Sequence, residues 1–199
     1  MQFILRIILR QAQDDNIWSN SNAGNIRADN YIIDAHTMNT RKKILILGIG
    51  NVLLKDEGIG VRVAEKMQKM SLPPDVEVME GGVKGLDLIY FIEGREKVIV
   101  IDAVKAGAPP GTLFRFTDKD LAAKKGIMRS AHGIDFSDVI AITGFMGIKP
   151  PEIIFLGIEP ESLDASLELS PLMEKNIPVL INLVMMELEK TSSQNEQLS

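Results

Sequence analysis

Short, uninterrupted apolar runs recur through the central part of the chain and predict buried strands. Residues 44–47 and 98–101 are the clearest of these runs, and residues 152–157 form a further one. Runs without polar alternation are typical of strands that are covered on both faces of a sheet. Residues 76–79 predict a shorter strand, and residues 113–116 predict an edge strand.

Between these runs, apolar residues recur at the three- and four-residue spacing of an amphipathic helix. The first such stripe consists of Ile59, Val63, Met67 and Met70. Further helices are predicted near residues 86–94, 134–142 and 179–188, with Pro178 expected at the first turn of the last helix or at a kink. This alternation of strands and helices predicts an α/β fold with three layers: a mostly parallel sheet and helices on both of its faces. In such sheets the functional residues lie just past the carboxyl ends of the strands.

Residues 1–37 depart from this pattern. Arg6 interrupts the apolar run of residues 3–9, a polar stretch follows, and no small-residue cleavage site lies close behind, so a secretory signal peptide is not the favoured interpretation. We expect a disordered leader, or a natural start at Met38. Residues 38–190 are then a single domain, a size that suits one core, and residues 191–199 are a polar tail.

Charge and composition narrow the possible functions. The net charge of the chain is -5. Residues 1–43 have a net charge of +2, and the remaining residues have a net charge of -7. An acidic body repels nucleic acid, and no run reaches the roughly 18 apolar residues of a membrane helix. The chain has no cysteine, which excludes thiol nucleophiles and Cys-ligated metals and fits a cytoplasmic protein. His36 and His132 are the only histidines.

A glycine-rich loop, residues 48–60, follows the first predicted strand and contains the acidic pair Asp56-Glu57. A dinucleotide-binding loop is one interpretation, but its third glycine would fall at Leu53, and two carboxylates near a helix N-terminus repel a pyrophosphate. Acidic helix capping explains either carboxylate alone, but not the whole run. We expect Glu57 to be functional, Asp56 to support it, and the glycines to serve backbone geometry. These glycines are Gly48, Gly50, Gly58 and Gly60.

Two further candidates follow later in the chain. Asp102 directly follows the predicted strand 98–101, and a buried carboxylate there needs a donor, a cation or water. Taken alone, Asp102 is explained slightly better as a cap of the next turn. His132 precedes a predicted helix, where a structural histidine is the commoner case. If the three loops converge, Glu57, Asp102 and His132 supply two oxygen ligands and one nitrogen ligand. Such a set suits a borderline divalent metal with open coordination positions.

Residues 46–62 resemble, over their full length, the signature of the hydrogenase maturation endopeptidases. Four more segments match that family in the same order: residues 80–82, 101–103, 130–133 and 157–163. Glu80 departs from the aspartate that the family often has at its position. The resemblance covers about residues 43–190, and residues 1–37 have no counterpart in it.

The resemblance implies a twisted sheet of the phosphorylase/hydrolase-like type, with Glu57, Asp102 and His132 as metal-contacting and catalytic residues. It implies a peptidase that removes a C-terminal extension from a nickel-loaded nickel–iron hydrogenase large-subunit precursor. A helical zinc protease needs two histidines one turn apart, and this domain has one. We therefore expect the nickel to be supplied by the substrate rather than tightly bound. Gly81, Gly82 and Lys84 are candidates for the lining of a peptide cleft.

Two other functions remain open at this point. A non-catalytic, nickel-binding hydrogenase assembly factor would use the same three ligands, and a mass measurement on the precursor would distinguish it from a peptidase. A nucleotide-binding enzyme on a similar sheet is the second, and titration with nucleotides would test it. Neither alternative requires nucleic acid or a membrane as partner.

Overall fold

The computed structural model describes residues 27–28, 31–32, 42–83, 88–117, 120 and 151–196. The chain divides into two compact units, Met1–Thr40 and Arg41–Ser199. In the first unit, β1 (Arg27–Ala28) and β2 (Tyr31–Ile32) pair as short antiparallel strands. The predicted helix over residues 134–142 lies outside the described residues.

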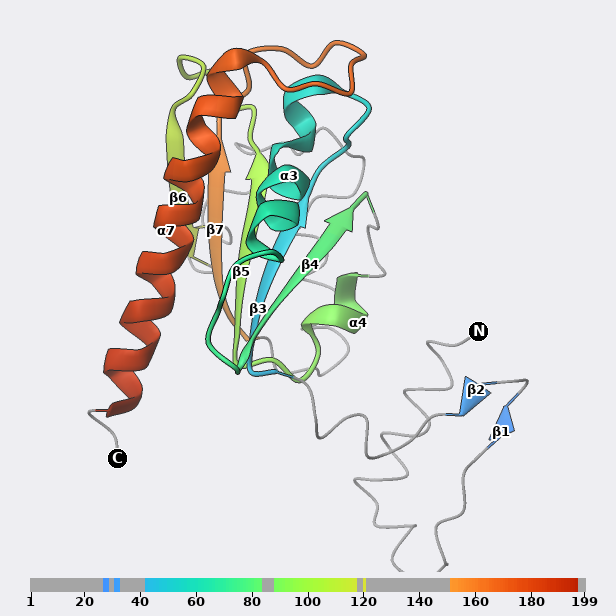
Figure 1. The fold of residues 1–199 in the computed structure, drawn as a ribbon, viewed down its shortest axis with the longest axis vertical. Helices are drawn as coiled ribbons and strands as arrows, with labels where there is room; N and C mark the ends of the chain where they lie inside the picture. Colours follow the sequence, from blue (N-terminus) through green and yellow to red (C-terminus); the bar gives the residue numbers. More distant parts are fainter. Residues whose placement is uncertain are drawn as a thin grey trace, which may run out of the picture. The chain divides into compact units, whose positions relative to one another are not determined.

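A five-stranded sheet forms the centre of the second unit, in the order β4-β3-β5-β7-β6 (Figure 1). Its strands are β3 (Ile44–Ile49), β4 (Val76–Gly82), β5 (Lys97–Ala103), β6 (Leu113–Thr117) and β7 (Glu152–Ile158). The pairs of β3 with β4, β3 with β5 and β5 with β7 are parallel, whereas β6 lies antiparallel to β7 at one edge. This confirms the mostly parallel sheet and the edge strand that the apolar runs predict.

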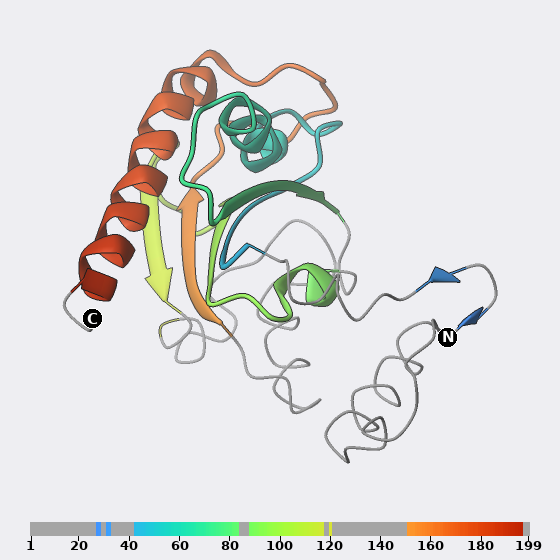
Figure 2. The same cartoon turned by 60° about the horizontal axis from the view of Figure 1, so that its bottom comes forward.

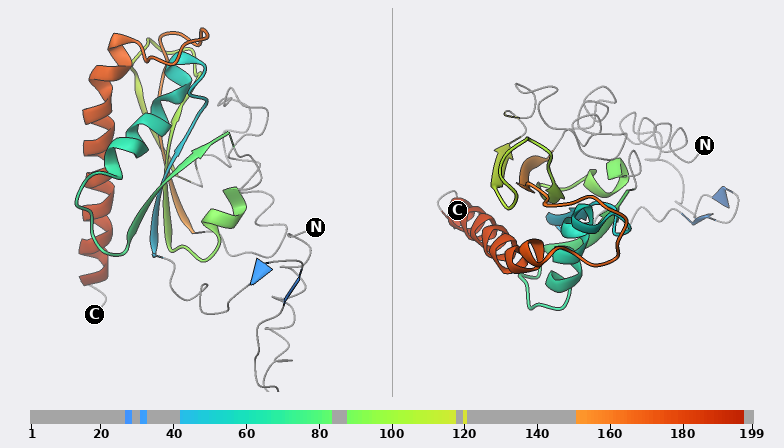
Figure 3. Two further views of the ribbon diagram at one scale, coloured as in Figure 1. Left: turned by 45° about the vertical axis from the view of Figure 1, so that its right-hand side comes forward. Right: turned by 90° about the horizontal axis from the view of Figure 1, so that it is seen from above.

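Helices cover both faces of the sheet, as predicted (Figure 2). On one face, α3 (Ile59–Met67) and α7 (Pro171–Glu196) pack on alternate strand residues such as Ile46 and Ile99. On the other face, the short helix α4 (Leu88–Ile92) packs on the intervening residues, such as Leu47 and Val100. Both sets are buried, which explains why these strands read as continuous apolar runs. Figure 3 shows the same layers from the side and from above.

The structure corrects the predicted start and end of the last helix. Pro178 lies inside α7 rather than at its first turn, because the helix already begins at Pro171. The Ser170 hydroxyl accepts a hydrogen bond from the Met173 amide at 3.2 Å, as an N-cap does. Met173 and Ile177 are fully buried, and this burial offsets the missing amide of Pro178. At its other end, α7 runs on to Glu196, over residues that the sequence assigns to the polar tail.

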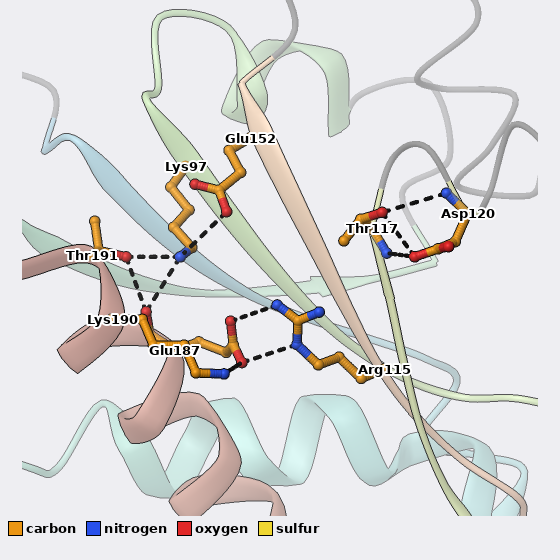
Figure 4. A network of polar contacts seen from close by, with 8 residues as sticks. All are labelled: Lys97, Arg115, Thr117, Asp120, Glu152, Glu187, Lys190 and Thr191. Atoms are coloured by element: carbon orange, nitrogen blue, oxygen red, sulfur yellow. Dashed lines mark hydrogen bonds and ion pairs between the residues drawn. The ribbon is translucent and has the colours of Figure 1, made fainter. Parts of the chain in front are cut away.

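A buried polar network fixes α7 to the sheet (Figure 4). The Lys97 ammonium on β5 donates to the Thr191 hydroxyl at 2.7 Å and to the Glu187 carbonyl at 3.2 Å. The Glu187 carboxylate accepts two hydrogen bonds from the Arg115 guanidinium on β6, at 3.0 and 2.9 Å. Lys97 lies at the amino end of β5, so this network holds the helix at the end of the strand opposite Asp102.

Candidate functional site

Glu57 lies in the turn that joins β3 to α3, within the 3-10 helix η1 (Lys55–Gly58). Its side chain is buried, with 1% of the residue exposed. Burial raises the pKa of the Glu57 carboxyl above its ordinary value of 4.5, because the charged form loses its hydration. A carboxyl group in such an environment gains more from a nearby cation than one on the open surface does.

Two glycines fix the place of this turn against the sheet. Gly60, in the first turn of α3, sits so close to two strand ends that a β-carbon there would overlap the carbonyl oxygens of Ile49 and Ile101. Gly50 has φ of 132°, and a β-carbon there would overlap the Glu57 carbonyl oxygen. These contacts confirm that the glycines of this loop serve backbone geometry and close approach.

Asp102 lies near the carboxyl end of β5 and is also buried, with 1% of the residue exposed. Its carboxylate accepts a hydrogen bond from the Ala103 amide at 2.8 Å. The residue opposite it on β7 is Gly157, where a β-carbon would lie 2.6 Å from the Val104 side chain. The small residue therefore lets the chain after Asp102 pack closely over the end of β7.

The turn with Glu57 and the strand end with Asp102 meet at the same edge of the sheet. Strands β3 and β5 are parallel neighbours, and Gly48 is the register partner of Ile101, the residue before Asp102. Gly60 then places the start of α3 directly on the Ile101 carbonyl. The expected convergence of these two loops is thus present in the backbone.

The third expected ligand, His132, lies outside the described residues, as does His36. Within the part of the chain that the structure describes, no group of three His, Cys, Asp or Glu side chains is placed to hold a metal. The three-residue set of Glu57, Asp102 and His132 therefore stays a prediction.

Asp56 has a different task from its neighbour Glu57. It is fully buried, and its carboxylate accepts three backbone hydrogen bonds. The donors are the amides of Glu161 at 3.0 Å, Ser162 at 3.0 Å and Ser170 at 2.7 Å. These contacts bear out the supporting role that the sequence predicts for Asp56.

Glu159 is a buried carboxylate for which the sequence gave no role of its own. It follows β7, and its side chain accepts from the amides of Ala106 at 2.8 Å and Gly107 at 3.2 Å. An acidic residue directly after a buried strand, followed by proline, is the signal that singles it out. Glu159 lies two residues past Gly157, the register partner of Asp102, so both carboxylates lie near the carboxyl ends of neighbouring parallel strands.

Gly81 and Gly82, two of the three residues predicted to line a peptide cleft, are the last residues of β4. Gly81 is buried, and a β-carbon there would lie 2.8 Å from Ile49 and 3.0 Å from Leu47, so this glycine serves core packing rather than a peptide cleft. Gly82 has φ of 53° and pairs with Ile49, where the register between β3 and β4 shifts. Glu80 is exposed, and Lys84 lies outside the described residues.

The comparisons with known proteins agree with one another. The family model HycI, hydrogenase maturation protease, matches residues 61–187, a stretch that contains positions 102 and 132 and begins after Glu57. The hydrogenase 2 maturation protease of Escherichia coli (strain K12) is 34% identical over 152 residues, 75% of this chain and 92% of that protein. The hydrogenase expression/formation protein HupD of Rhodobacter capsulatus is 43% identical over 125 residues, and the match spans 60% of its length and 62% of this chain.

Solved structures share the fold. The hydrogenase maturating endopeptidase HybD from E. coli superposes with a TM-score of 0.68 at 34% identity, over 75% of this chain and 93% of that one. The nickel–iron hydrogenase maturation protease HybD from Thermococcus kodakarensis gives a TM-score of 0.60 at 26% identity, over 72% and 97%. No helix in the described part of the chain is long and apolar enough to cross a membrane. On these matches, the chain belongs to the hydrogenase maturation protease family.

Proposed function

We propose that this chain is an endopeptidase that removes a C-terminal extension from a nickel-loaded nickel–iron hydrogenase large-subunit precursor. The substrate's own nickel is contacted by Glu57, Asp102 and His132. The observation that carries the proposal is a pair of buried carboxylates in a chain of this family: Glu57 in the turn after β3, and Asp102 near the carboxyl end of the adjacent parallel strand β5. Because the chain spans 60% of the length of HupD from R. capsulatus, activity, substrate and partner all belong to the proposal.

The environment of Glu57 supports a site for a visiting cation. Burial raises the pKa of this carboxyl, so its ionised form is costly until a positive charge arrives. Two carboxylates and one imidazole also leave coordination positions open for groups of the substrate. Such a set binds metal modestly when it is alone, and the ligands that hold nickel in the precursor complete the coordination. Cleavage then depends on prior metal loading.

The peptide bond is cut by water in this proposal. The chain has no cysteine, and no serine stands in the strand-turn-helix context of a nucleophile elbow. Glu57 or Asp102 accepts a proton from the attacking water, and the nickel carried by the substrate polarises the scissile carbonyl. The acidic charge of the domain fits a protein partner rather than nucleic acid, and the absence of cysteine fits a reaction in the cytoplasm.

The test is incubation of the purified chain with nickel-loaded and with metal-free precursor, followed by measurement of the intact mass of the precursor. We expect the loaded precursor alone to be shortened. Glu57→Gln, Asp102→Asn and His132→Ala should each abolish shortening while urea unfolding shows a folded protein. Glu161→Gln is the matched control, because it neutralises an exposed carboxylate on a loop at the same edge of the sheet.

Three results would contradict parts of the proposal. Equal cleavage of metal-free precursor would remove nickel from the mechanism. Stoichiometric binding of loaded precursor without a change of mass would identify an assembly factor instead of a peptidase. Loss of folding in all three variants would return Glu57, Asp102 and His132 to structural roles.

A further inference from the structure

One segment touches both loops that carry the proposed ligands. It consists of residues 159–170, between β7 and α7, and we call it the brace. On one side it binds the turn with Glu57, and on the other side it binds the loop that follows Asp102. Both contacts are made through buried carboxylates that the proposed chemistry does not use.

Asp56 joins the brace to the turn with Glu57. Its Oδ2 accepts the amides of Glu161 and Ser162 at the start of the brace, and its Oδ1 accepts the amide of Ser170 at the end. One side chain thus closes both ends of a ten-residue loop, the arrangement of an Ω-loop with its base pinned. Two backbone bonds from the three residues before Asp56 add to this, because the Lys55 amide donates to the Ser166 carbonyl at 2.9 Å and the Ser166 amide donates to the Leu53 carbonyl at 3.0 Å.

Glu159 joins the brace to the loop after Asp102. Its side chain accepts from the Ala106 and Gly107 amides, at 2.8 and 3.2 Å, four and five residues beyond Asp102. Its backbone holds the far end of the same loop, since the Gly111 amide donates to the Glu159 carbonyl at 2.8 Å and the Glu159 amide donates to the Thr112 carbonyl at 2.9 Å. Glu159 therefore spans both halves of the loop.

Hydrogen bonds from backbone amides to a buried carboxylate are charge-assisted and directional. An amide side chain of the same shape does not replace them, because its NH2 group meets N–H donors at one of the two positions. Asp56 and Glu159 are therefore specific to their sites. Along the brace, Pro160 alone separates Glu159 from Glu161, a partner of Asp56.

We propose that Asp56 and Glu159 are positioning residues, which act through the brace to set the spacing between Glu57 and Asp102. The inference rests on the proposed function, because it assigns these residues to the same site. Substrate-derived nickel meets Glu57 and Asp102 together only if their two loops hold a fixed separation. Loss of either carboxylate frees one loop from the brace while the sheet and its core stay in place.

The experiment compares Asp56→Asn and Glu159→Gln with wild type by amide hydrogen exchange and by steady-state processing of loaded precursor. Asp56→Asn should lose protection at the amides of Glu161, Ser162 and Ser170, and Glu159→Gln at those of Ala106 and Gly107. Each variant should lower kcat about 10- to 100-fold, the usual effect of removing an outer-shell partner. KM should stay unchanged, because the groups that bind the remote parts of the substrate are intact.

Two exposed carboxylates of the brace provide matched controls. Glu168→Gln and Glu161→Gln make the same change of charge in the same segment without removing a side chain that accepts from the brace, and we expect wild-type kcat for both. Urea unfolding at the assay temperature establishes that each variant is folded. If Asp56→Asn does not fold, Glu159→Gln and the shorter Glu159→Asp carry the test, with Glu159→Asp expected to restore part of kcat.

The outcomes separate this inference from the proposed function. Folded variants that lose the local amide protection but process at the wild-type rate would overturn the positioning role while the peptidase assignment stands. A higher KM in both variants at unchanged kcat would also overturn it, because that result assigns the two residues to substrate binding. If wild type itself leaves the loaded precursor uncut, the proposed function fails first, and the positioning role fails with it.

Discussion

Replacement of Glu187 by glutamine tests how strongly the polar network holds α7 to the sheet. The pKa of Glu187 is lowered from 4.5 to about 2. Hydrogen bonding by Arg115 is the largest cause, burial opposes it, and the hydrogen bond from Lys190 and the charges of both residues lower the pKa further. A shift of about 2.5 units corresponds to about 3 kcal/mol of preference for the ionised form in the folded protein. Arg115 and Lys190 are 45% and 55% exposed, so solvent weakens the pairing, and we expect Glu187→Gln to lower the free energy of unfolding by about 2 kcal/mol at pH 7.

The dependence on pH has a definite sign. The pKa of Glu187 is lower in the folded than in the unfolded chain, so its contribution is complete above pH 4.5 and is lost as the pH falls towards about 2. Urea unfolding of wild type and Glu187→Gln at several pH values measures the difference directly. The difference should be constant from pH 7 to about pH 5 and shrink below that.

Glu174→Gln on the same helix is the control for this experiment. Glu174 is 55% exposed and lies 3.7 Å from Lys66, so its removal should change stability by less than about 1 kcal/mol. A Glu187→Gln effect no larger than that of Glu174→Gln would refute the reasoning. A difference from wild type that grows as the pH falls would refute it as well, because that trend requires a raised pKa.

Three further predictions concern the candidate site. Glu57→Gln should stabilise the fold at pH 7, because burial raises the pKa of this carboxyl and the neutral amide avoids the cost of burying a charge. In urea unfolding, the stability difference between this variant and wild type should widen as the pH rises from 4.5, and a destabilised variant would contradict the prediction. Asp102→Asn should keep the thermal midpoint, because its side-chain oxygen still accepts from the Ala103 amide, while processing is lost. Gly60→Ala should lower the free energy of unfolding by about 1–3 kcal/mol, because the added carbon overlaps two carbonyl oxygens. An unchanged midpoint in thermal or urea unfolding would show that the start of α3 is not packed as described.

The sheet was predictable because burial on both faces leaves a direct mark on the sequence. Val98, Ile99 and Val100 are fully buried whichever face they point to, so the strand reads as one apolar run. The start of α7 was harder to predict, because Pro178 suits either the first turn of a helix or a kink inside one, and its local preference is for the first turn. Burial of Met173 and Ile177 before Pro178 overrides that local preference, and single-residue propensity carries no information about it.

The site was predictable only in part, for a physical reason. Glu57 and Asp102 stand out because functional groups of parallel sheets gather past the carboxyl ends of strands, and the register of β3 and β5 brings their loops to one edge. The partners of Asp56 lie 105 to 114 residues away along the chain, and those of Glu159 lie 52 and 53 away. Side-chain to backbone bonds of this range leave no spacing pattern in a single sequence. The position of His132 stays a prediction because this residue lies outside the part of the chain that the structure describes.

Asp56 and Glu57 are adjacent, equally buried and chemically alike, yet the structure treats them in opposite ways. Three backbone amides surround the Asp56 carboxylate, so its buried charge contributes to the fold. Burial instead raises the pKa of Glu57, so its ionised form costs free energy of desolvation. Under the proposed function a cation delivered by the substrate recovers that free energy only when it arrives. The modest affinity for metal at rest and the response to a loaded substrate then both follow from the buried carboxylate of Glu57. The three amide hydrogen bonds to Asp56 hold the neighbouring Glu57 in place before the substrate binds.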